Sequence, residues 1–430
     1  MKSFLRIFIA IFLFSNAVVA FGQTADTNLS EKRKQKLAQQ APDFVETQIG
    51  MIELPSPYSS EPTANVSQVI PWPENLKPQA PAGFKVTKYA GDLDHPRISY
   101  VAPNNDVFVA ETNDGKQSAN RITLLRDTNG DMQPDERFVF LENLNQAYGM
   151  LVLDGYFYVA NVDGLKRFPY KEGQTTINGK GETILPLPAG GYNHHWTRNL
   201  IAAKDGSKIY VTVGSASNVG EYGMEKEKRR ANIIEINPDG SGEKIYASGL
   251  RNPVGMDWNP VTGELWTAVN ERDNLGNDLV PDYITSVKEG GFYGWPYSYY
   301  GQIKDPRWSH DPHENMVQKA IVPDVPVKSH TASLGLEFYT GEQFPEKFKN
   351  GAFVGQHGSW NRKNLSGYKV LFVPFADGKP QQPEEFLTGF MANDSGSEVY
   401  GRPVGVTTLP DGSLLVNDDD GNVIWRISAE

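Results

Sequence analysis

One pattern occurs six times between Asp92 and the C-terminus: a polar loop, an apolar strand, a tight turn and a second apolar strand. The copies begin DLDHPRISYV, NLNQAYGMLV, NHHWTRNLIA, GLRNPVGMDW, SHTASLGLEF and GRPVGVTTLP. A repeat of this length indicates an array of identical supersecondary units, and units built from strands alone favour a β-propeller. We therefore predict an all-β fold, a six-bladed β-propeller of four-stranded antiparallel blades.

The two ends of the repeat region complement each other. The last repeat ends after SLLVNDDDGNVIWRI, one strand short of a blade, and GFKVTKYAGDL before the first repeat can supply the missing strand. An N-terminal strand in the last blade would close the ring and remove an exposed sheet edge. We assign the propeller to residues 82–430.

The segment before the propeller differs in composition from the repeats. Residues 1–20 carry two basic residues, an apolar run over Ile7–Phe14 and a small-residue V-x-A ending at Ala20, which is typical of a secretory signal peptide. Residues 21–81 are polar and rich in proline, and only the Glu31–Gln40 stretch can form a helix. The sequence leaves open whether this arm lies along the propeller or is disordered.

Composition limits the chemistry that the chain can perform. It contains no cysteine, so it can form neither disulfides nor a C-x-x-C-H haem attachment site. Its formal net charge of −11 argues against nucleic acid as a partner. We expect a periplasmic or secreted protein with no transmembrane anchor in the mature chain. Any redox chemistry would need a cofactor held by oxygen and nitrogen ligands.

Strand direction predicts that one face of the propeller carries the function. Because the strands of a blade are antiparallel, loops alternate between the two faces. The connections between blades share a face with the connections between second and third strands, and the chemically interesting residues fall in these two loop classes. Five of them stand at equivalent places before the inner strands: Gln146, His195, Arg251, Thr331 and Arg402.

The side chains in these loops suggest acid–base chemistry on an anionic or carbonyl-bearing ligand. His195 is a candidate general base because imidazole titrates near neutrality. Arg251, Arg362 and Arg402 offer planar donors that match carboxylates. Alternatively, His195 is an ordinary surface residue and the arginines tie neighbouring loops together. The oxygen-rich segment Asn270–Tyr283 suits a hard cation such as calcium, or it is simply a solvated loop.

A set of motifs in fixed order connects the chain to a known family. HHWTRNL, VTVGSASNVGE, GLRNPVGMDWNP, GFYGWP, GQHGSWNR and GRPVGVTTLPDGSLLVNDDDG together resemble the glucose/sorbosone dehydrogenase family, especially its sorbosone dehydrogenase-like branch. The resemblance covers roughly residues 82–430. It implies an exported six-bladed propeller that binds pyrroloquinoline quinone (PQQ) with calcium (Ca²⁺) and oxidises aldoses or related sugars. Electrons would pass to an external acceptor, a quinone or a cytochrome.

The resemblance also assigns roles residue by residue. His195 would be the catalytic general base, and Arg251 would lie beside the reacting carbonyl of the cofactor. The backbone carbonyls of Arg272 and Asp273 would bind calcium, and Gln146 would bind substrate. The cofactor would contact four further residues: Asn252, Thr331, Arg362 and Arg402.

Three positions depart from the family pattern. Tyr400 stands where a second cofactor arginine is expected, Asn361 lies near the position of the cofactor lysine, and Ser215 lies near that of an acidic residue. The pocket should therefore differ from that of the glucose-oxidising members.

We predict a PQQ- and calcium-dependent dehydrogenase of an aldose, sorbosone or a related sugar. Two alternatives come from other classes. One is a calcium-dependent lactone hydrolase of propeller fold, which would need carboxylates and asparagines around the axis. The other is a non-catalytic propeller that binds carbohydrate or protein.

Overall fold

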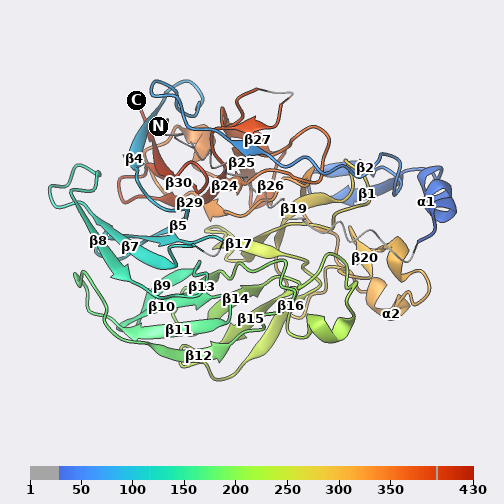
Figure 1. Ribbon diagram of the computed structural model, residues 1–430, viewed down its shortest axis with the longest axis horizontal. Helices are drawn as coiled ribbons and strands as arrows, with labels where there is room; N and C mark the ends of the chain where they lie inside the picture. The colour runs from blue at the N-terminus through green and yellow to red at the C-terminus, as the bar shows by residue number, and fades with distance from the viewer. Residues whose placement is uncertain (1–28, 116, 394–395) are drawn as a thin grey trace, which may run out of the picture.

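Six antiparallel sheets form a closed ring in the computed structural model, which describes residues 29–115, 117–393 and 396–430 (Figure 1). Each blade is built on four strands, which follow the sequence from the axis outward except in the last blade, and the inner strands of neighbouring blades contact one another. The predicted all-β, six-bladed propeller is confirmed. Alternation of apolar and polar residues was the signal, because each strand packs its apolar side chains between neighbouring blades.

The first three blades follow the chain without interruption. Blade 1 comprises β5 (Pro96–Val101), β6 (Val107–Glu111), β7 (Arg121–Arg126) and β8 (Glu136–Leu141). Blade 2 comprises β9 (Met150–Leu153), β10 (Tyr156–Asn161), β11 (Gly164–Pro169) and β12 (Glu182–Pro186). Blade 3 comprises β13 (Leu200–Ala202), β14 (Ile209–Val213), β15 (Asn232–Ile236) and β16 (Lys244–Ser248), with the 3₁₀ turn η1 (Met224–Glu227) after β14.

The last three blades carry the irregular features. Blade 4 comprises β17 (Pro253–Trp258), β18 (Leu265–Val269), β19 (Pro281–Ser286) and β22 (Val325–Ser329). Its aromatic insertion holds β20 (Ser298–Tyr299), β21 (Ile303–Lys304), η2 (Pro306–Trp308) and α2 (Glu314–Val317). Blade 5 comprises β23 (Glu337–Phe338), β24 (Gly351–Gln356), β25 (Lys369–Ala376) and β27 (Glu384–Leu387), with η3 (Glu346–Phe348) and the short β26 (Lys379–Pro380).

Blade 6 closes the ring in the way the sequence predicts. It contains β29 (Pro403–Thr408), β30 (Leu414–Asp418) and β31 (Val423–Ala429) from the C-terminus. Its outer strand is β4 (Phe84–Ala90), which pairs antiparallel with β31 so that Phe84 faces Ala429. Because the first strand of the propeller region joins the last three in one sheet, the last blade has no missing strand.

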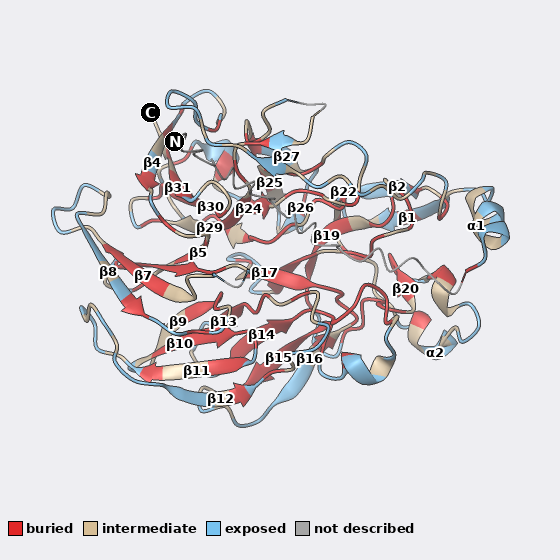
Figure 2. Cartoon of the chain, in the orientation of Figure 1, coloured by how far each residue is buried: buried red, intermediate tan, exposed pale blue. Residues whose placement is uncertain are grey.

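The core consists of separate layers between blades, as Figure 2 shows by the buried inner strands and exposed outer rims. Between blades 1 and 2, the rings of Phe108, Phe140 and Phe157 lie with centroids 4.6–4.9 Å apart. Between blades 5 and 6, Phe84 of β4 packs edge-on against Phe344. These layers hold the loops of one face at fixed positions around the axis.

The described part of the N-terminal arm lies on the propeller, which answers the question that the sequence leaves open. Helix α1 (Glu31–Ala38) lies within the predicted helical stretch. A hairpin of β1 (Asp43–Thr47) and β2 (Gly50–Leu54) follows, which was not predicted. Further on, β3 (Gln68–Val69) pairs in parallel with β28 (Glu398–Val399).

The predicted signal peptide, residues 1–20, lies outside the described residues. Within the described part of the chain, none of the helices has the length and apolar character needed to cross a membrane.

Candidate functional site

His195 lies in the loop before β13, and its hydrogen bonds determine which ring nitrogen is basic. Its Nδ1 is 3.0 Å from the carbonyl oxygen of Ser215 and 2.9 Å from the Ser215 hydroxyl. A carbonyl only accepts, and the Ser215 hydroxyl donates to the carbonyl of Ser217 at 2.6 Å. We therefore assign the proton to Nδ1, which leaves the lone pair on Nε2. No residue in the described ranges hydrogen-bonds Nε2.

The surroundings of His195 keep its ring neutral. The side chain is buried, with 9% of the residue exposed. Burial lowers the pKa of His195 well below its ordinary value, and the nearby charge of Arg251 lowers it further. A neutral imidazole with a free Nε2 lone pair can accept a proton.

Arg251 is buried beside His195 and is fully engaged by protein groups. Its Nη1 donates to the carbonyl of Glu271 at 2.6 Å, and its Nε donates to the carbonyl of Asn218 at 3.0 Å. Its Nη2 lies 3.0 Å from Asp273 Oδ2 and 2.9 Å from Asn218 Oδ1. Arg251 thus ties the top loops of blades 3 and 4 together, as the alternative interpretation of the sequence expected, while its charge still acts on His195.

Asn252 packs tightly against the His195 loop. A Cβ added to Gly214 would lie 2.4 Å from Asn252 Oδ1 and 2.6 Å from His195 Cβ, so only glycine fits between them. Asn252 Oδ1 is buried and has no hydrogen-bond partner among the described residues. An unpaired buried oxygen is costly, so this position favours a polar ligand group.

Asp273 is held by charges on two sides. Its Oδ2 pairs with Arg251, and its Oδ1 lies 3.2 Å from His330 Nδ1. Burial alone would raise the pKa of Asp273, but Arg251 and His330 outweigh it and lower the pKa to about 2. Asp273 is therefore an ionised anchor of the loop.

One of the two carbonyls predicted to bind calcium, that of Asp273, is already hydrogen-bonded. The backbone oxygen of Asp273 accepts from Arg272 Nη1 at 2.8 Å and from Asn218 Nδ2 at 3.1 Å. The guanidinium of Arg272 in turn pairs with the buried Asp305. A cationic side chain thus occupies the space next to this oxygen, and the arrangement as it lies does not fit calcium.

Arg402 lies in a second cluster on the same face. Its Nε donates to the carbonyl of His357 at 2.9 Å, its Nη2 donates to Gly358 at 3.2 Å, and its guanidinium lies over the ring of Tyr368. Its guanidinium lies 3.5 Å from the carboxylate of Asp420, and a fifth of the side chain is exposed. Arg402 is therefore less fully engaged than Arg251.

Arg97 connects the two clusters, although the sequence analysis did not select it. It pairs with Asp419 at 2.6 Å and lies over the ring of Trp196, next to His195. Asp419 also contacts His357 Nε2 at 2.9 Å. His357, Asp419 and Asp420 lie close enough to share a metal ion, but Arg97 and Arg402 already neutralise these carboxylates. Arg97 lies at the start of the inner strand β5, a position that structural residues also occupy, so the sequence did not distinguish it as a site residue.

The other predicted site residues are placed differently. Thr331 is buried, donates to Asp282 Oδ2 at 3.1 Å and accepts from Gln356, so its hydroxyl is already used. Arg362 pairs with Asp278 at 2.6 Å. Gln146 lines a cleft of about 500 Å³ with His194 and other residues of blades 1 to 3. Thus the structure groups His195, Arg251, Asn252 and Asp273, and leaves Arg362 among other loops.

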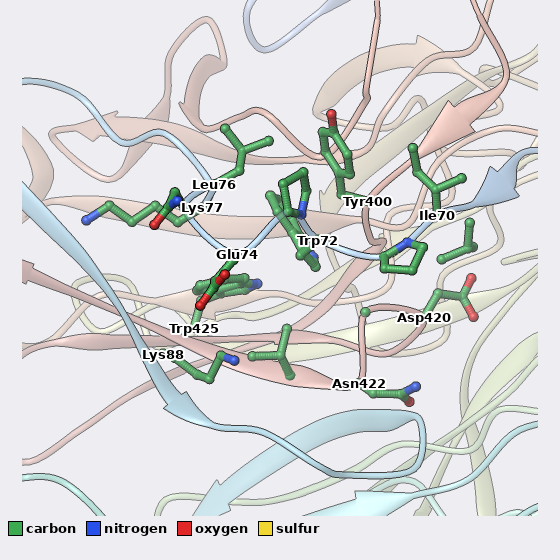
Figure 3. Close-up of a pocket in the computed structure, with 16 residues that line it drawn as sticks. Ile70, Trp72, Glu74, Leu76, Lys77, Lys88, Tyr400, Asp420, Asn422 and Trp425 are labelled. Carbon is green, nitrogen blue, oxygen red and sulfur yellow. The ribbon is translucent and has the colours of Figure 1, made fainter.

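The N-terminal arm crosses the loops of blades 4 to 6 on this face. Asn65 donates from its backbone to the carbonyl of Trp360 at 2.7 Å, and Asn361 donates to the carbonyl of Thr63 at 3.4 Å. Near blade 6 the arm borders the cavity of about 790 Å³ in Figure 3, where Trp72 lies next to Tyr400. The two ring centroids are 5.1 Å apart. The arm therefore contacts both Asn361 and Tyr400, two of the positions that depart from the family pattern.

Comparison with known proteins shows which family this chain resembles. The family described as Glucose / Sorbosone dehydrogenase matches residues 164–370. The chain is 29% identical to an uncharacterized protein of Borreliella burgdorferi over 367 residues, 82% of this chain and 91% of that one. It is 27% identical to the aldose sugar dehydrogenase YliI of Escherichia coli over 254 residues, 58% of this chain and 57% of that one. The chain is similar to the glucose/sorbosone dehydrogenase family, which confirms the resemblance carried by its motifs.

Solved structures agree with this similarity at the level of fold. The holo form of the pyranose dehydrogenase PQQ domain from Coprinopsis cinerea has a TM-score of 0.67 and 19% identity, covering 83% of this chain and 98% of that chain. At this identity the likeness shows the shared propeller alone. Similarity to the glucose/sorbosone dehydrogenase family does not favour the lactone-hydrolase or binding-only alternatives.

Proposed function

We propose that this chain is an exported quinoprotein that oxidises an aldose, sorbosone or a related sugar by hydride transfer to PQQ, with His195 as the general base. The observation that carries the proposal is the state of His195: buried, neutral, and held through Nδ1 by Ser215. Its similarity to an aldose sugar dehydrogenase and to a pyranose dehydrogenase PQQ domain supports the reaction class. Export rests on the signal-like residues 1–20.

The reaction needs a group that removes the proton of a sugar hydroxyl while a hydride leaves the carbon that bears this hydroxyl. When bound, PQQ would supply the two-electron acceptor for that hydride. His195 Nε2 would take the proton from the sugar hydroxyl, and Ser215 would hold the ring in the tautomer that makes this possible. Burial, and then the charge of Arg251, would lower the pKa of His195 and so keep the resting imidazole neutral.

The residues present fit PQQ in part. The buried Asn252 Oδ1 has no hydrogen-bond partner among the described residues and packs with His195 against Gly214, so a donor group of a ligand would satisfy it if one reached this position. Arg402, whose guanidinium is partly exposed, would hold a carboxylate of the cofactor. Arg362 is paired with Asp278, and Thr331 is hydrogen-bonded to Asp282. Each would have to break this interaction before it could bind the cofactor. The proposal includes no role for calcium, because the Asp273 carbonyl already accepts hydrogen bonds from Arg272 and Asn218.

Titration of the purified chain with PQQ, with and without added calcium, tests the cofactor. We expect a saturable change in the quinone absorbance, and dye reduction by the loaded protein with at least one aldose of a sugar panel. Arg402→Gln should weaken PQQ binding, whereas Arg229→Gln, an arginine paired with Glu243 on blade 3, serves as the matched control. Absence of any PQQ binding, together with hydrolysis of a lactone panel, would replace this proposal with the hydrolase alternative.

A further inference from the structure

A cleft with an aromatic wall lies beside the proposed general base. It has a volume of about 500 Å³, within the range of pockets that take small-molecule ligands. His194, whose ring centroid lies 4.6 Å from that of His195, belongs to its lining. The cleft therefore begins one residue from the group that would take the proton.

Two tyrosines near this cleft expose their rings to solvent. Tyr192 is 44% exposed and lines the cleft, and Tyr222 is 47% exposed. Their ring centroids are 4.6 Å apart, and Tyr192 is also stacked on His194 with an interplanar angle of 9°. Large aromatic rings that remain this exposed, next to a site, are suited to stack on the apolar face of a ligand ring.

Polar groups complete the same cleft. Asp114, Asn145 and Gln146 line it from the loops of blades 1 and 2. A carboxylate accepts hydrogen bonds from the hydroxyls of a sugar, and an amide side chain can both donate to them and accept from them. An aromatic wall combined with such groups matches a saccharide, which has an apolar face and a rim of hydroxyls.

The loop that carries Tyr192 has the conformational freedom of glycine. Gly190 and Gly191 have φ values of +79° and +59°, and a Cβ added at either position would meet no atom within 4 Å. Glycine is therefore favoured at these positions by the left-handed backbone conformation and not by a close contact with a neighbour. Tyr192 is thus presented on a turn at the rim of the cleft and is not locked into the core.

We infer that this cleft binds the non-reacting part of an oligosaccharide, with Tyr192 and Tyr222 stacking on a ring beyond the one that is oxidised. The inference rests on the proposed function for the position of the reacting ring. It narrows the substrate class from single sugars to saccharides of two or more rings. Tyr192 and Tyr222 act here as positioning residues.

Direct binding tests this inference without turnover. Maltotriose, cellotriose and glucose would be titrated into the full chain without PQQ, with calorimetry as the readout. We expect at least one trisaccharide to bind more tightly than glucose. Tyr192→Ala and Tyr222→Ala should each weaken it about tenfold, the loss of roughly one stacking contact. Tyr192→Phe, which keeps the ring, should restore affinity, and Phe44→Ala on β1, another exposed aromatic, should change nothing.

The outcomes separate the inference from the proposed function. Trisaccharide affinity no better than that of glucose, or affinity unaffected in both alanine variants, overturns the inference even if the PQQ-loaded chain oxidises glucose. If the chain binds trisaccharide through the tyrosines but does not bind PQQ, the inference about the cleft is supported and the proposed function is contradicted. In the loaded enzyme, the ratio of kcat/KM for trisaccharide to that for glucose should fall in Tyr192→Ala, through KM.

Discussion

At His195, one backbone neighbour decides which nitrogen can act as a base. The Ser215 carbonyl can only accept, so it fixes the proton on Nδ1 and leaves Nε2 unprotonated. The sequence identified His195 from its place before an inner strand, but it could not show the role of Ser215. Ser215 stands near the position of an acidic residue in the family, and here its carbonyl and hydroxyl together orient the ring.

The pH dependence of activity should report this environment. Burial and Arg251 lower the pKa of His195, so the base stays unprotonated throughout the neutral range. Activity is lost only as pH falls through that depressed pKa. We therefore expect log kcat/KM to be flat from about pH 8 to below the ordinary histidine pKa of about 6.5. An acid limb with its midpoint at or above 6.5 would contradict the account.

Gly214 offers a second test at the scale of one residue. A methyl group there would press on Asn252 Oδ1 and His195 Cβ at 2.4 and 2.6 Å. Gly214→Ala should therefore displace both side chains, reduce kcat at least tenfold, and cost about 1–3 kcal/mol of unfolding free energy. Gly91→Ala is the matched control, because its nearest neighbour is the Lys88 side chain at 3.4 Å. Equal activity in the two variants would show that the packing at Gly214 is not needed.

Among the elements, the strands of the repeat and helix α1 were predictable from the sequence, whereas the β1–β2 hairpin was missed. The strands of the repeat alternate in apolar and polar residues. Strand β4 completes blade 6 as expected, because the last repeat contains only three of the four strands of a blade. The β1–β2 hairpin has no such partner in the repeat and exposes most of its residues, so its alternation carried no signal. The contacts of the arm also depend on distant loops, which periodicity does not report.

Trp72 is the main anchor of the arm on blade 6. Its Nε1 donates to Asp418 Oδ2 at 2.9 Å, and its ring lies 5.2 Å from that of Trp425. Trp72→Ala should lower the free energy of unfolding by about 3 kcal/mol, measured by urea denaturation. Leu76→Ala, on the same arm but 36% exposed, should cost far less. If the two variants unfold at the same urea concentration, the arm is not anchored through Trp72.

Across the whole molecule, all six inner strands meet around a cavity of about 270 Å³ in the central channel. Asp257 of blade 4 and Glu337 of blade 5 line it. Burial raises the pKa of Asp257 to about 7. Burial, and then the charge of Asp257, raise the pKa of Glu337 to about 8. These carboxyls hold protons in the folded protein that the unfolded chain would release at neutral pH.

This difference in protonation predicts how stability changes with pH. Since the folded state binds more protons than the unfolded state between about pH 4 and 8, the contribution of Glu337 to stability falls as pH rises. In Glu337→Gln that loss is absent, so the unfolding free energy of the variant relative to wild type should increase from pH 5 to about pH 9. Glu346→Gln, an exposed glutamate, is the control. A difference that does not change with pH would contradict the raised pKa.

The central claim is that His195 removes the proton during oxidation of a sugar by bound PQQ. Stopped-flow mixing of the PQQ-loaded protein with its best aldose, following the quinone absorbance in a single turnover, tests it most directly. We expect His195→Asn to bind PQQ like wild type but to be reduced about 10²–10⁴-fold more slowly. Reduction of His195→Asn at a rate near that of wild type would contradict the claim.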